Sequence, residues 1–265
     1  MTQLISVIMA TYNEEKNIRK SIDSIISQSY ENWELIICDD CSSDNTVSII
    51  KEYQRKDNRI HLIVNDKNIK LAASLNKCLK LCKGAYVARM DADDECLPNR
   101  FEVQISFFMN NDSYDVVGTA ALINDETGCY KIRRMKEIPT KNDVLLGPVF
   151  IHPSIMMKTK VYRELGGYSV LERTTKGQDW DLWFRFFAKN YCGYNLQEPL
   201  LIYHEDKNDY KKRTFKTSMK FFKTALFGFK LIKPPFYKWI LVFKPVVSFF
   251  VPNCIKKKIH NKRVV

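Results

Sequence analysis

Three acidic side chains fall within four residues of the sequence, at Asp91, Asp93 and Asp94. They follow residues 85–90, a mostly apolar stretch of the kind that forms a buried strand. Carboxylates so close together repel one another and raise each other's pKa unless a cation neutralises them. Oxygen ligands completed by substrate phosphates suit Mg²⁺ or Mn²⁺. The cluster therefore predicts a divalent metal site.

A second group of polar residues lies at residues 177–185, where an apolar helical pattern begins. Asp179 lies at the loop-to-helix transition, where an acidic residue is either the N-cap of the helix or a base that takes a proton. Asp181 has the ordinary interpretation of a first-turn residue favoured by the helix dipole. Periodicity does not separate a cap from a catalyst, so both interpretations of Asp179 stay open.

The elements that must position these residues alternate between strand-like and helical patterns. Strands are expected at residues 4–10, 34–38, 60–64 and 85–90, and helices at residues 14–28, 44–55 and 71–81. Apolar strands joined by helical crossovers imply a parallel sheet that is covered on both faces. Ligands bind such sheets beyond the carboxyl ends of the strands. The residues that directly follow the strands are therefore the expected site. They are acidic after two of the strands, at Asp39-Asp40 and at residues 91–94.

Between residues 110 and 148 the pattern loosens into short strands, expected at 116–123 and 130–134. Mixed or antiparallel strands are the expectation for this half of the chain. The eight cysteines are scattered singly through a chain long enough to fold without disulfides, so reduced thiols are expected.

Four motifs, taken together, resemble the family 2 glycosyltransferases. They are SVIMATYNEE at residues 6–15, DDCSSDNT at 39–46, RMDADD at 89–94 and QDWDLW at 178–183. The order and spacing match throughout residues 4–205. The resemblance implies an α/β protein of the GT-A fold, with a Rossmann-like, mostly parallel sheet and helices on both faces. It also divides the chain into a transferase domain at 1–206, made of a nucleotide-binding half at 1–110 and an acceptor-side half at 111–206, and a basic tail at 207–265.

The resemblance also implies roles for individual residues. Tyr12 packs on the donor base, Asp40 hydrogen-bonds that base, Asp91 contacts the ribose and Asp93 binds the metal. Asp179 matches the catalytic base of an inverting, single-displacement transfer. Further contacts to the nucleotide sugar are expected from Ala10, Arg89 and Ala92, and contacts on the acceptor side from His152, Gln178 and Trp180.

Two positions depart from the family pattern. Gln178 stands where the family usually has Glu, which removes a negative charge beside Asp179 and leaves the acceptor geometry open. His204 follows Ile202-Tyr203 directly, where the family often has Arg. Imidazole can bind a metal or a diphosphate, so His204 is a candidate metal ligand, although a lone histidine is more often structural. His152 is either a conformational element ahead of Pro153 or a residue near the acceptor.

The net charge of +12 is concentrated at the end of the chain: residues 207–265 carry +15 and residues 1–206 carry −3. Lysines alternate there with aromatic residues, and no apolar run reaches the roughly 20 residues of a spanning helix. A basic amphipathic helical tail that binds an anionic membrane surface is therefore expected. No recognised nucleic-acid motif accompanies the charge, so nucleic acid is not the expected partner.

The expected activity is transfer of a sugar from a nucleotide diphosphate sugar, with UDP-sugars the leading class, to a saccharide or lipid-linked acceptor in surface-polysaccharide assembly. A hexosyl- or N-acetylhexosaminyltransferase is expected. The start of the chain lacks the features of a signal peptide, so the expected location is cytoplasmic, peripheral at the inner face of the cell membrane. Two alternatives stay open: a non-catalytic membrane scaffold, and a nucleotidyltransferase, which the lack of a glycine-rich phosphate loop disfavours.

Overall fold

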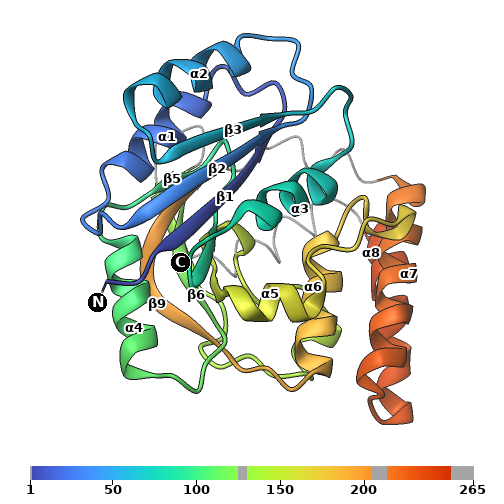
Figure 1. Cartoon of the computed structure of the whole chain (residues 1–265). Helices are drawn as coiled ribbons and strands as arrows, with labels where there is room; N and C mark the ends of the chain where they lie inside the picture. Colours follow the sequence, from blue (N-terminus) through green and yellow to red (C-terminus); the bar gives the residue numbers. More distant parts are fainter. Residues whose placement is uncertain (1, 125–129, 205–213, 252–265) are drawn as a thin grey trace.

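The computed structural model describes residues 2–124, 130–204 and 214–251 (Figure 1). Its described strands form one nine-stranded sheet in the order β3-β2-β1-β4-β8-β6-β9-β5, and β7 pairs with β6. Helices cover both faces of this sheet (Figure 1). The expected α/β architecture is therefore confirmed.

The first half of the sheet is parallel. It consists of β1 (Ile5–Thr11), β2 (Trp33–Asp39), β3 (Ile60–Val64) and β4 (Tyr86–Arg89), with β1 between β2 and β4. The crossovers are α1 (Ile18–Ile26), α2 (Thr46–Lys56) and α3 (Leu71–Leu81). Their order matches the expected βαβαβαβ series.

The first helix begins at Ile18, four residues later than expected. The preceding residues are held in a turn because their amides bind the neighbouring loop: Glu14 N–H donates to Thr46 Oγ1 (2.9 Å) and Glu15 N–H to Asp44 Oδ2 (3.1 Å). Asn13 has a φ of +56°, a left-handed conformation that also interrupts a helix.

The second half of the sheet is mixed, as expected. Its centre is β6 (Val116–Asn124), which is parallel to β9 (Gly193–His204) and antiparallel to β7 (Tyr130–Arg133) and β8 (Met156–Lys158). The antiparallel pairing of β8 with β4 joins the two halves. Short β5 (Glu95–Cys96) pairs with β9 and so ties the loop after β4 to the last strand.

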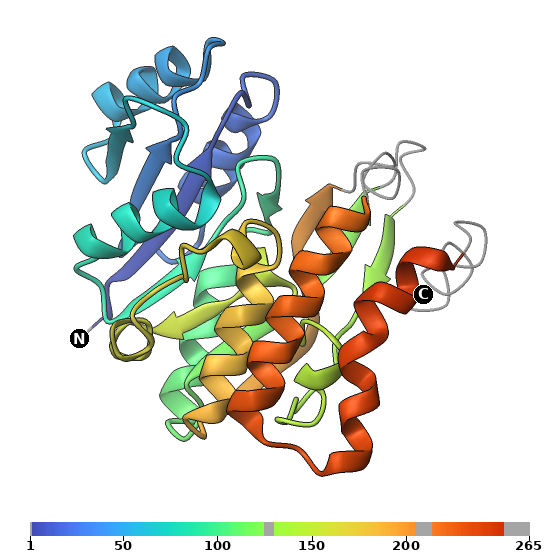
Figure 2. The same ribbon diagram turned by 90° about the vertical axis from the view of Figure 1, so that its right-hand side faces the viewer.

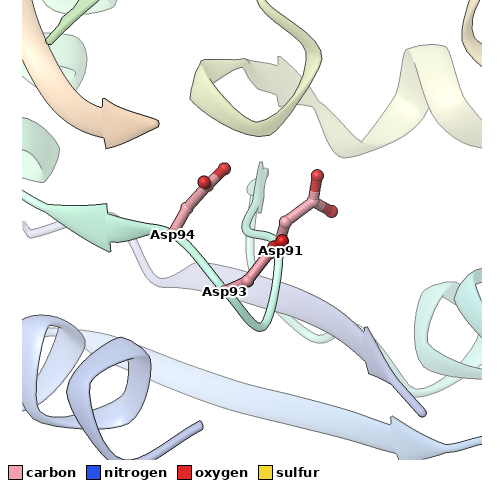
Figure 3. Close-up of side chains that lie close together, drawn as sticks. All are labelled: Asp91, Asp93 and Asp94. Carbon is pink, nitrogen blue, oxygen red and sulfur yellow. The ribbon is translucent and has the colours of Figure 1, made fainter. Parts of the chain in front are cut away.

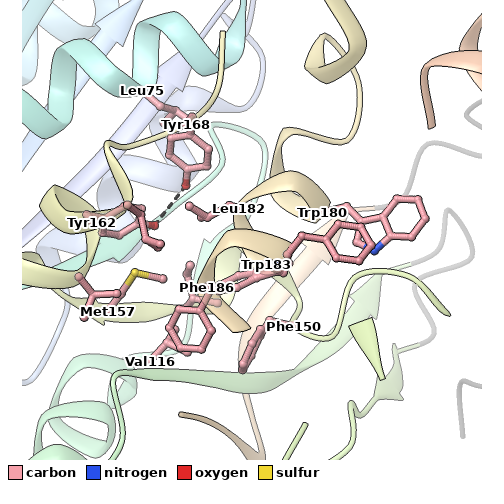
Figure 4. Packing of buried hydrophobic residues seen from close by; sticks show 14 of the residues in the cluster. Leu75, Val116, Phe150, Met157, Tyr162, Tyr168, Trp180, Leu182, Trp183 and Phe186 are labelled. Atoms are coloured by element: carbon pink, nitrogen blue, oxygen red, sulfur yellow. Dashed lines mark hydrogen bonds between the residues drawn. The ribbon is translucent and has the colours of Figure 1, made fainter. Parts of the chain in front are cut away.

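Two apolar layers fill the space between the sheet and its helices. One layer contains residues of α1, α2 and α4 (Arg100–Asn110). The other contains residues of α3, α5 (Thr159–Leu165), α6 (Gln178–Ala188) and α7 (Phe215–Ile232). Leu182, Trp183 and Phe186 lie on the buried face of α6 (Figure 4). The apolar spacing that predicted this helix face therefore reflects core packing. This packing fixes the position of the N-terminus of α6.

The described part of the basic tail shares this core. Ala225 and Phe229 of α7 are fully buried, and a Cβ added at Gly228 would lie 2.2 Å from the ring of Phe184. After α7 the chain turns and runs back along it as the 3₁₀ helix η4 (Phe236–Phe243) and α8 (Lys244–Phe250) (Figure 2). The fold therefore includes α7, whereas the division of the chain at residues 206/207 stays a prediction about function.

Among the described helices, none combines the length and the apolar character needed to cross a bilayer. The six cysteines in the described part of the chain are free thiols, as expected.

Candidate active site

The parallel strands β1, β2 and β4 end at the same edge of the sheet, and each is followed by predicted site residues. Tyr12 follows β1 and is 48% exposed, so its ring is accessible to a ligand. Asp40 follows β2, and Asp91 lies two residues beyond β4. Ala10 is the second-last residue of β1 and lies partly buried beside them. The structure thus places the predicted donor-side residues around one edge.

Asp91, Asp93 and Asp94 each offer a carboxylate oxygen within 4.8 Å of the others (Figure 3). Burial, together with the charges of Asp91 and Glu14, raises the pKa of Asp93 to about 7. Burial and the charges of Asp91 and Asp93 raise the pKa of Asp94 well above its ordinary value. The second oxygen of Asp94, Oδ2, is buried without a hydrogen-bond partner. The cluster therefore fits a cation, which would supply the missing partner and neutralise the charges.

Side chains from outside the loop hold this cluster in place. Ser21 Oγ on α1 donates to the carbonyl oxygens of Ala92 (2.7 Å) and Asp94 (2.6 Å). The backbone N–H of His204, at the end of β9, donates to Asp94 Oδ1 (3.0 Å). Ala92 is buried and its carbonyl oxygen is already bound. The loop is therefore fixed on two sides before any ligand binds.

Arg89 lies behind the cluster and not in the open site. Its guanidinium is almost fully buried and forms an ion pair with Asp91. The carbonyl oxygen of Arg89 accepts a hydrogen bond from Arg100 Nη2 (2.9 Å), and Arg100 is itself fully buried. The expected direct contact of Arg89 with the nucleotide sugar stays a prediction, and in this structure its buried guanidinium contacts the carboxylate of Asp91.

The imidazole of His204 is not part of the acidic cluster. Its Nε2 lies 3.7 Å from Glu95 Oε1 and 3.2 Å from Asn124 Nδ2. The cluster of possible metal-binding side chains found among the described residues contains only the three aspartates. The expected metal contact of His204 stays a prediction: in this structure its side chain lies toward Glu95, and its Nδ1 is buried without a hydrogen-bond partner. Its backbone supports Asp94.

Asp40 is buried, and both of its oxygens accept hydrogen bonds from the segment between β3 and α3. Oδ1 accepts from Asn65 Nδ2 (2.9 Å), Ile69 N–H (2.8 Å) and Ser74 Oγ (3.1 Å), and Oδ2 accepts from Lys70 N–H (2.8 Å). Lys70 has a φ of +74° at this point. In this structure Asp40 shapes the loop at residues 65–70, and a bound base would have to share its carboxylate.

Asp179 is the second residue of α6, and the N-cap is Gly177, which has a φ of +92° and no capping side chain. The N-cap interpretation of Asp179 is therefore excluded. Burial is the main cause that raises the pKa of Asp179, and the charge of Asp91 raises it further. Asp179, on α6, thus lies within electrostatic reach of Asp91 of the acidic cluster.

Asp181 has a different environment. It is fully buried and pairs with Arg173 Nη1 (2.5 Å) and Arg185 Nε (2.8 Å) while accepting a hydrogen bond from Ser169 Oγ (2.6 Å). It connects three segments of the acceptor-side half. Its role is therefore structural and larger than that of a first-turn residue.

The predicted acceptor-side residues Gln178 and Trp180 also have different environments. Gln178 is the first residue of α6 and is half-buried beside Asp179. Trp180 is buried, and its Nε1 donates to the carbonyl oxygen of Val144 (2.7 Å). Figure 4 shows its indole lying away from Tyr168. Trp180 therefore packs in the core of this structure, and its expected acceptor contact stays a prediction.

His152 contacts a pair of tyrosines. Its Nε2 is 2.8 Å from the hydroxyl of Tyr168. That hydroxyl is 3.2 Å from the hydroxyl of Tyr162 (Figure 4). Burial and the nearby charge of Arg89 hold the pKa of His152 well below its usual range, so its imidazole is neutral. The charges of Asp91 and Asp179 both act on the Tyr168 hydroxyl. Tyr168 therefore lies within electrostatic reach of both Asp91 and Asp179.

Sequence reasoning missed Ser21, Arg100 and Tyr168 as supports of the site. A signal was present for Ser21, a polar residue on the apolar face formed by Ile18, Ile22 and Ile25. For Arg100 the sequence holds no comparable signal, because its burial depends on long-range contacts with β4 and Ile155.

Comparisons with known proteins agree with this geometry. Residues 6–166 match the glycosyl transferase family 2 model. The chain is 42% identical over 262 residues to the putative glycosyltransferase EpsE of Bacillus subtilis, covering 98% of this chain and 94% of EpsE. It is 40% identical over 124 residues to the Escherichia coli enzyme WfgD, named as a UDP-Glc:alpha-D-GlcNAc-diphosphoundecaprenol beta-1,3-glucosyltransferase, covering 47% of this chain and 48% of WfgD.

Two solved structures share the fold. The chain superposes on residues 1–349 of Staphylococcus aureus TarS in complex with UDP-GlcNAc with a TM-score of 0.68 and 19% identity, covering 84% of this chain and 65% of that one. It superposes on the Pyrobaculum calidifontis mannosyltransferase PcManGT, in complex with GDP-Man and Mn²⁺, with a TM-score of 0.68 and 19% identity, covering 91% and 68%. The GT-A fold is thereby confirmed. From the four motifs, the strand-edge site and the match over most of its length, the chain belongs to glycosyl transferase family 2.

Proposed function

We propose that this glycosyltransferase moves a sugar from a nucleotide diphosphate sugar, with UDP-sugars the leading class, to a lipid-linked saccharide in surface-polysaccharide assembly, with inversion at the anomeric carbon. The observation that carries the proposal is a pair of acidic groups within electrostatic reach of each other: the cluster Asp91, Asp93 and Asp94 after β4, and Asp179 at the start of α6. The UDP-GlcNAc complex of TarS and the lipid-linked substrate in the name of WfgD support the donor and acceptor classes.

On the donor side, Asp91, Asp93 and Asp94 would hold Mn²⁺ or Mg²⁺, and PcManGT was solved with Mn²⁺. A bound divalent ion supplies positive charge that stabilises a leaving diphosphate. Arg89 orients Asp91 through their ion pair, and the exposed ring of Tyr12 packs on the base. Asp40 contributes through the loop that it shapes, with its carboxylate available to the base when that loop rearranges.

On the acceptor side, Asp179 takes the proton from the acceptor hydroxyl as the oxygen of that hydroxyl bonds to the anomeric carbon. The bond from that carbon to the nucleotide diphosphate breaks, and the leaving group departs with its electron pair. A single displacement of this kind inverts the configuration. The raised pKa of Asp179 brings the carboxylate closer to the proton affinity that a general base needs at neutral pH. Gln178 and His152 lie beside this path and remain proposed acceptor-side residues.

The proposed place of action is the inner face of the cell membrane, because a lipid-linked acceptor and a +15 charge at residues 207–265 both point to an anionic membrane surface.

Thermal stabilisation by nucleotide sugars, measured with and without Mn²⁺, tests this function. A ligand at about 100 times its dissociation constant stabilises a protein by roughly 2.7 kcal/mol. We expect one nucleotide sugar to stabilise the wild type only when the metal is present, and Asp93→Asn to abolish the effect. Asp112→Asn, a change at an almost fully exposed carboxylate, is the matched control. Full metal-dependent stabilisation of the Asp93→Asn variant would contradict the donor site, and the absence of any responding nucleotide sugar would favour a scaffold.

A further inference from the structure

The helical hairpin formed by α7, η4 and α8 exposes a row of large apolar side chains on its second arm. Phe236, Ile240, Val247 and Phe250 are 88, 71, 60 and 72% exposed, and Tyr237 and Phe243 are also exposed. The members recur at intervals of three or four residues, the spacing of one side of a helix. The opposite side of the arm faces α7: Val242 is buried, and the ring of Trp239 lies 5.8 Å from that of Phe229. We call the exposed row the apolar stripe.

The charged residues of the hairpin itself have one sign. Residues 214–251 contain seven lysines and no acidic residue. Lys230 and Lys233 are exposed at the turn between the two arms, and Lys216 and Lys223 are exposed on α7. A row of aromatic and aliphatic side chains bordered by lysines is the composition of helices that lie in the interface of an anionic bilayer. A second protein chain would need an acidic and apolar surface to match it.

The hairpin also has a fixed direction relative to the active site. The first half of α7 lies against the N-terminus of α6: a Cβ at Gly177 would lie 2.6 Å from the ring of Phe221, and Thr224 Oγ1 donates to the carbonyl oxygen of Arg173 (3.1 Å). The last residues of α8 return to the same end, where the rings of Phe249 and Phe215 lie 5.6 Å apart. The apolar stripe therefore runs from the turn, at Phe236, back toward the end of the hairpin that adjoins α6 and Asp179 (Figure 2).

We propose that the apolar stripe inserts into the headgroup region of an anionic bilayer and that the hairpin lies along the membrane, which holds the strand-edge site of Asp179 beside the lipid surface. This inference rests on the proposed function in one respect, the lipid-linked acceptor, whose saccharide such an orientation would bring to the site. It differs from a loosely attached basic tail, because α7 is packed into the core and so fixes the angle between membrane and active site.

Vesicle sedimentation tests the surface. Vesicles of equal parts phosphatidylglycerol and phosphatidylcholine should bind the full chain, and pure phosphatidylcholine or high salt should weaken the binding. The combined change Phe236→Ser, Ile240→Ser and Val247→Ser should lower the affinity roughly 100-fold, because three inserted side chains are lost. The matched control changes three exposed apolar residues elsewhere, Ile26→Ser, Leu81→Ser and Met109→Ser, and should bind as the wild type does.

Fluorescence quenching by bromine-labelled lipids tests the orientation. Phe250→Trp places the fluorophore at the end of the stripe near the active site. Met109→Trp places it at an exposed position on α4, which lies on the opposite side of Figure 1 from the hairpin. We expect quenching above the wild-type background only for Phe250→Trp. Equal vesicle binding by the triple stripe variant would overturn the proposal, as would a wild-type dimer that ignores vesicles and becomes monomeric in that variant.

The two proposals fail in different ways. Hydrolysis of the nucleotide sugar in the absence of membranes depends only on the donor site, so the stripe variant should keep it and Asp93→Asn should lose it. Loss of vesicle binding with intact hydrolysis therefore reports on the stripe alone.

Discussion

The two aspartates at the start of α6 show how residues of one type, two positions apart, acquire different roles. Asp179 is half-buried, has no salt-bridge partner among the described residues, and lies within electrostatic reach of Asp91. Asp181 is fully buried between two arginines. The first carboxylate can exchange a proton with a ligand, whereas the second is committed to holding the fold.

Asp181→Ala should therefore destabilise the protein without removing a catalytic group. Breaking a buried ion pair by deleting one partner typically costs about 3–5 kcal/mol, because the other charges stay buried. Urea unfolding measures the loss. Glu52→Ala, which deletes one partner of an exposed pair with Arg19, should cost about 1 kcal/mol or less. Similar losses in the two variants would mean that Asp181 is not a structural anchor.

The raised pKa of Asp179 predicts a pH dependence. A general base works only when it is ionised, so kcat should fall as the pH falls through the pKa of Asp179. Burial and Asp91 raise this pKa, so the fall should lie at a higher pH than for an ordinary aspartate. Profiles of kcat at saturating metal and donor report the bound enzyme. The residual activity of Asp179→Asn should lack this acidic limb, and an unchanged limb would assign it to another group.

At the scale of elements, the site depends on contacts that bring α1 and β9 to the loop after β4. Ser21 Oγ is the clearest of these contacts, since one hydroxyl approaches the carbonyl oxygens of both Ala92 and Asp94. The hydroxyl has a single proton, so the two acceptors share it. The loop geometry is thereby set by a helix that carries no ligand-binding residue of its own.

Ser21→Ala should weaken metal-dependent donor binding about tenfold, the lower end of the usual effect for groups that orient metal ligands. Stability should fall by only about 1 kcal/mol. Titration with Mn²⁺ in the presence of donor measures the first effect and thermal unfolding the second. Ser27→Ala removes a hydroxyl whose one side-chain bond among the described residues is to the Ser24 carbonyl oxygen, and the metal affinity of this variant should be normal. An unaffected Ser21→Ala variant would show that the loop holds its shape alone.

The sequence predicted most of the first half of the fold because its signals are local. Apolar strands such as residues 34–38 and helical patterns such as 71–81 are visible without knowledge of their neighbours. In the second half, β5 has two residues and β8 three, too short to show an alternating pattern. Their pairing with β9 and β4 depends on residues about 70 to 105 positions away, which local periodicity does not reveal.

The candidate site, like the fold, could be predicted only where its signals are local in the sequence. The acidic cluster was predictable, because the mutual repulsion of its carboxylates is a property of adjacent residues. The environments of Arg89, Trp180 and His204 were not, because each depends on a residue of another element: Arg100 on α4, which donates to the Arg89 carbonyl oxygen, the carbonyl of Val144, and Glu95 on β5. Residue types and their spacing predicted where the site lies, whereas side-chain direction and burial became visible only in the structure.

At the scale of the whole molecule, α7 connects the basic end of the chain to the transferase core. Gly228 allows this contact, since any side chain there would meet the ring of Phe184. A deletion of residues 207–265 would therefore expose the apolar side of α6 as well as remove the lysines. Membrane binding is better tested by surface changes than by truncation.

Gly228→Ala distinguishes a packed helix from a free one by the sign of its effect. In a free, exposed helix the change should stabilise by about 1 kcal/mol through helix propensity. Against Phe184 it forces overpacking, which typically costs about 1–3 kcal/mol, so we expect a net loss or no gain of stability. Lys223→Ala, at an exposed position of α7, should change stability by a few tenths of a kcal/mol. A clear increase in melting temperature for Gly228→Ala would contradict the packing of α7.

The turnover of Asp179→Asn tests the catalytic account most directly. This change keeps the shape of the side chain and, because Gly177 is the N-cap, disturbs no cap. With metal and donor bound, turnover to the acceptor should fall about 10² to 10⁴ fold, the usual cost of losing a general base. Donor affinity and melting temperature should stay at the wild-type values, since the metal-binding cluster and the Asp181 ion pairs are intact. Near-normal turnover in a folded, donor-binding Asp179→Asn variant would contradict the mechanism.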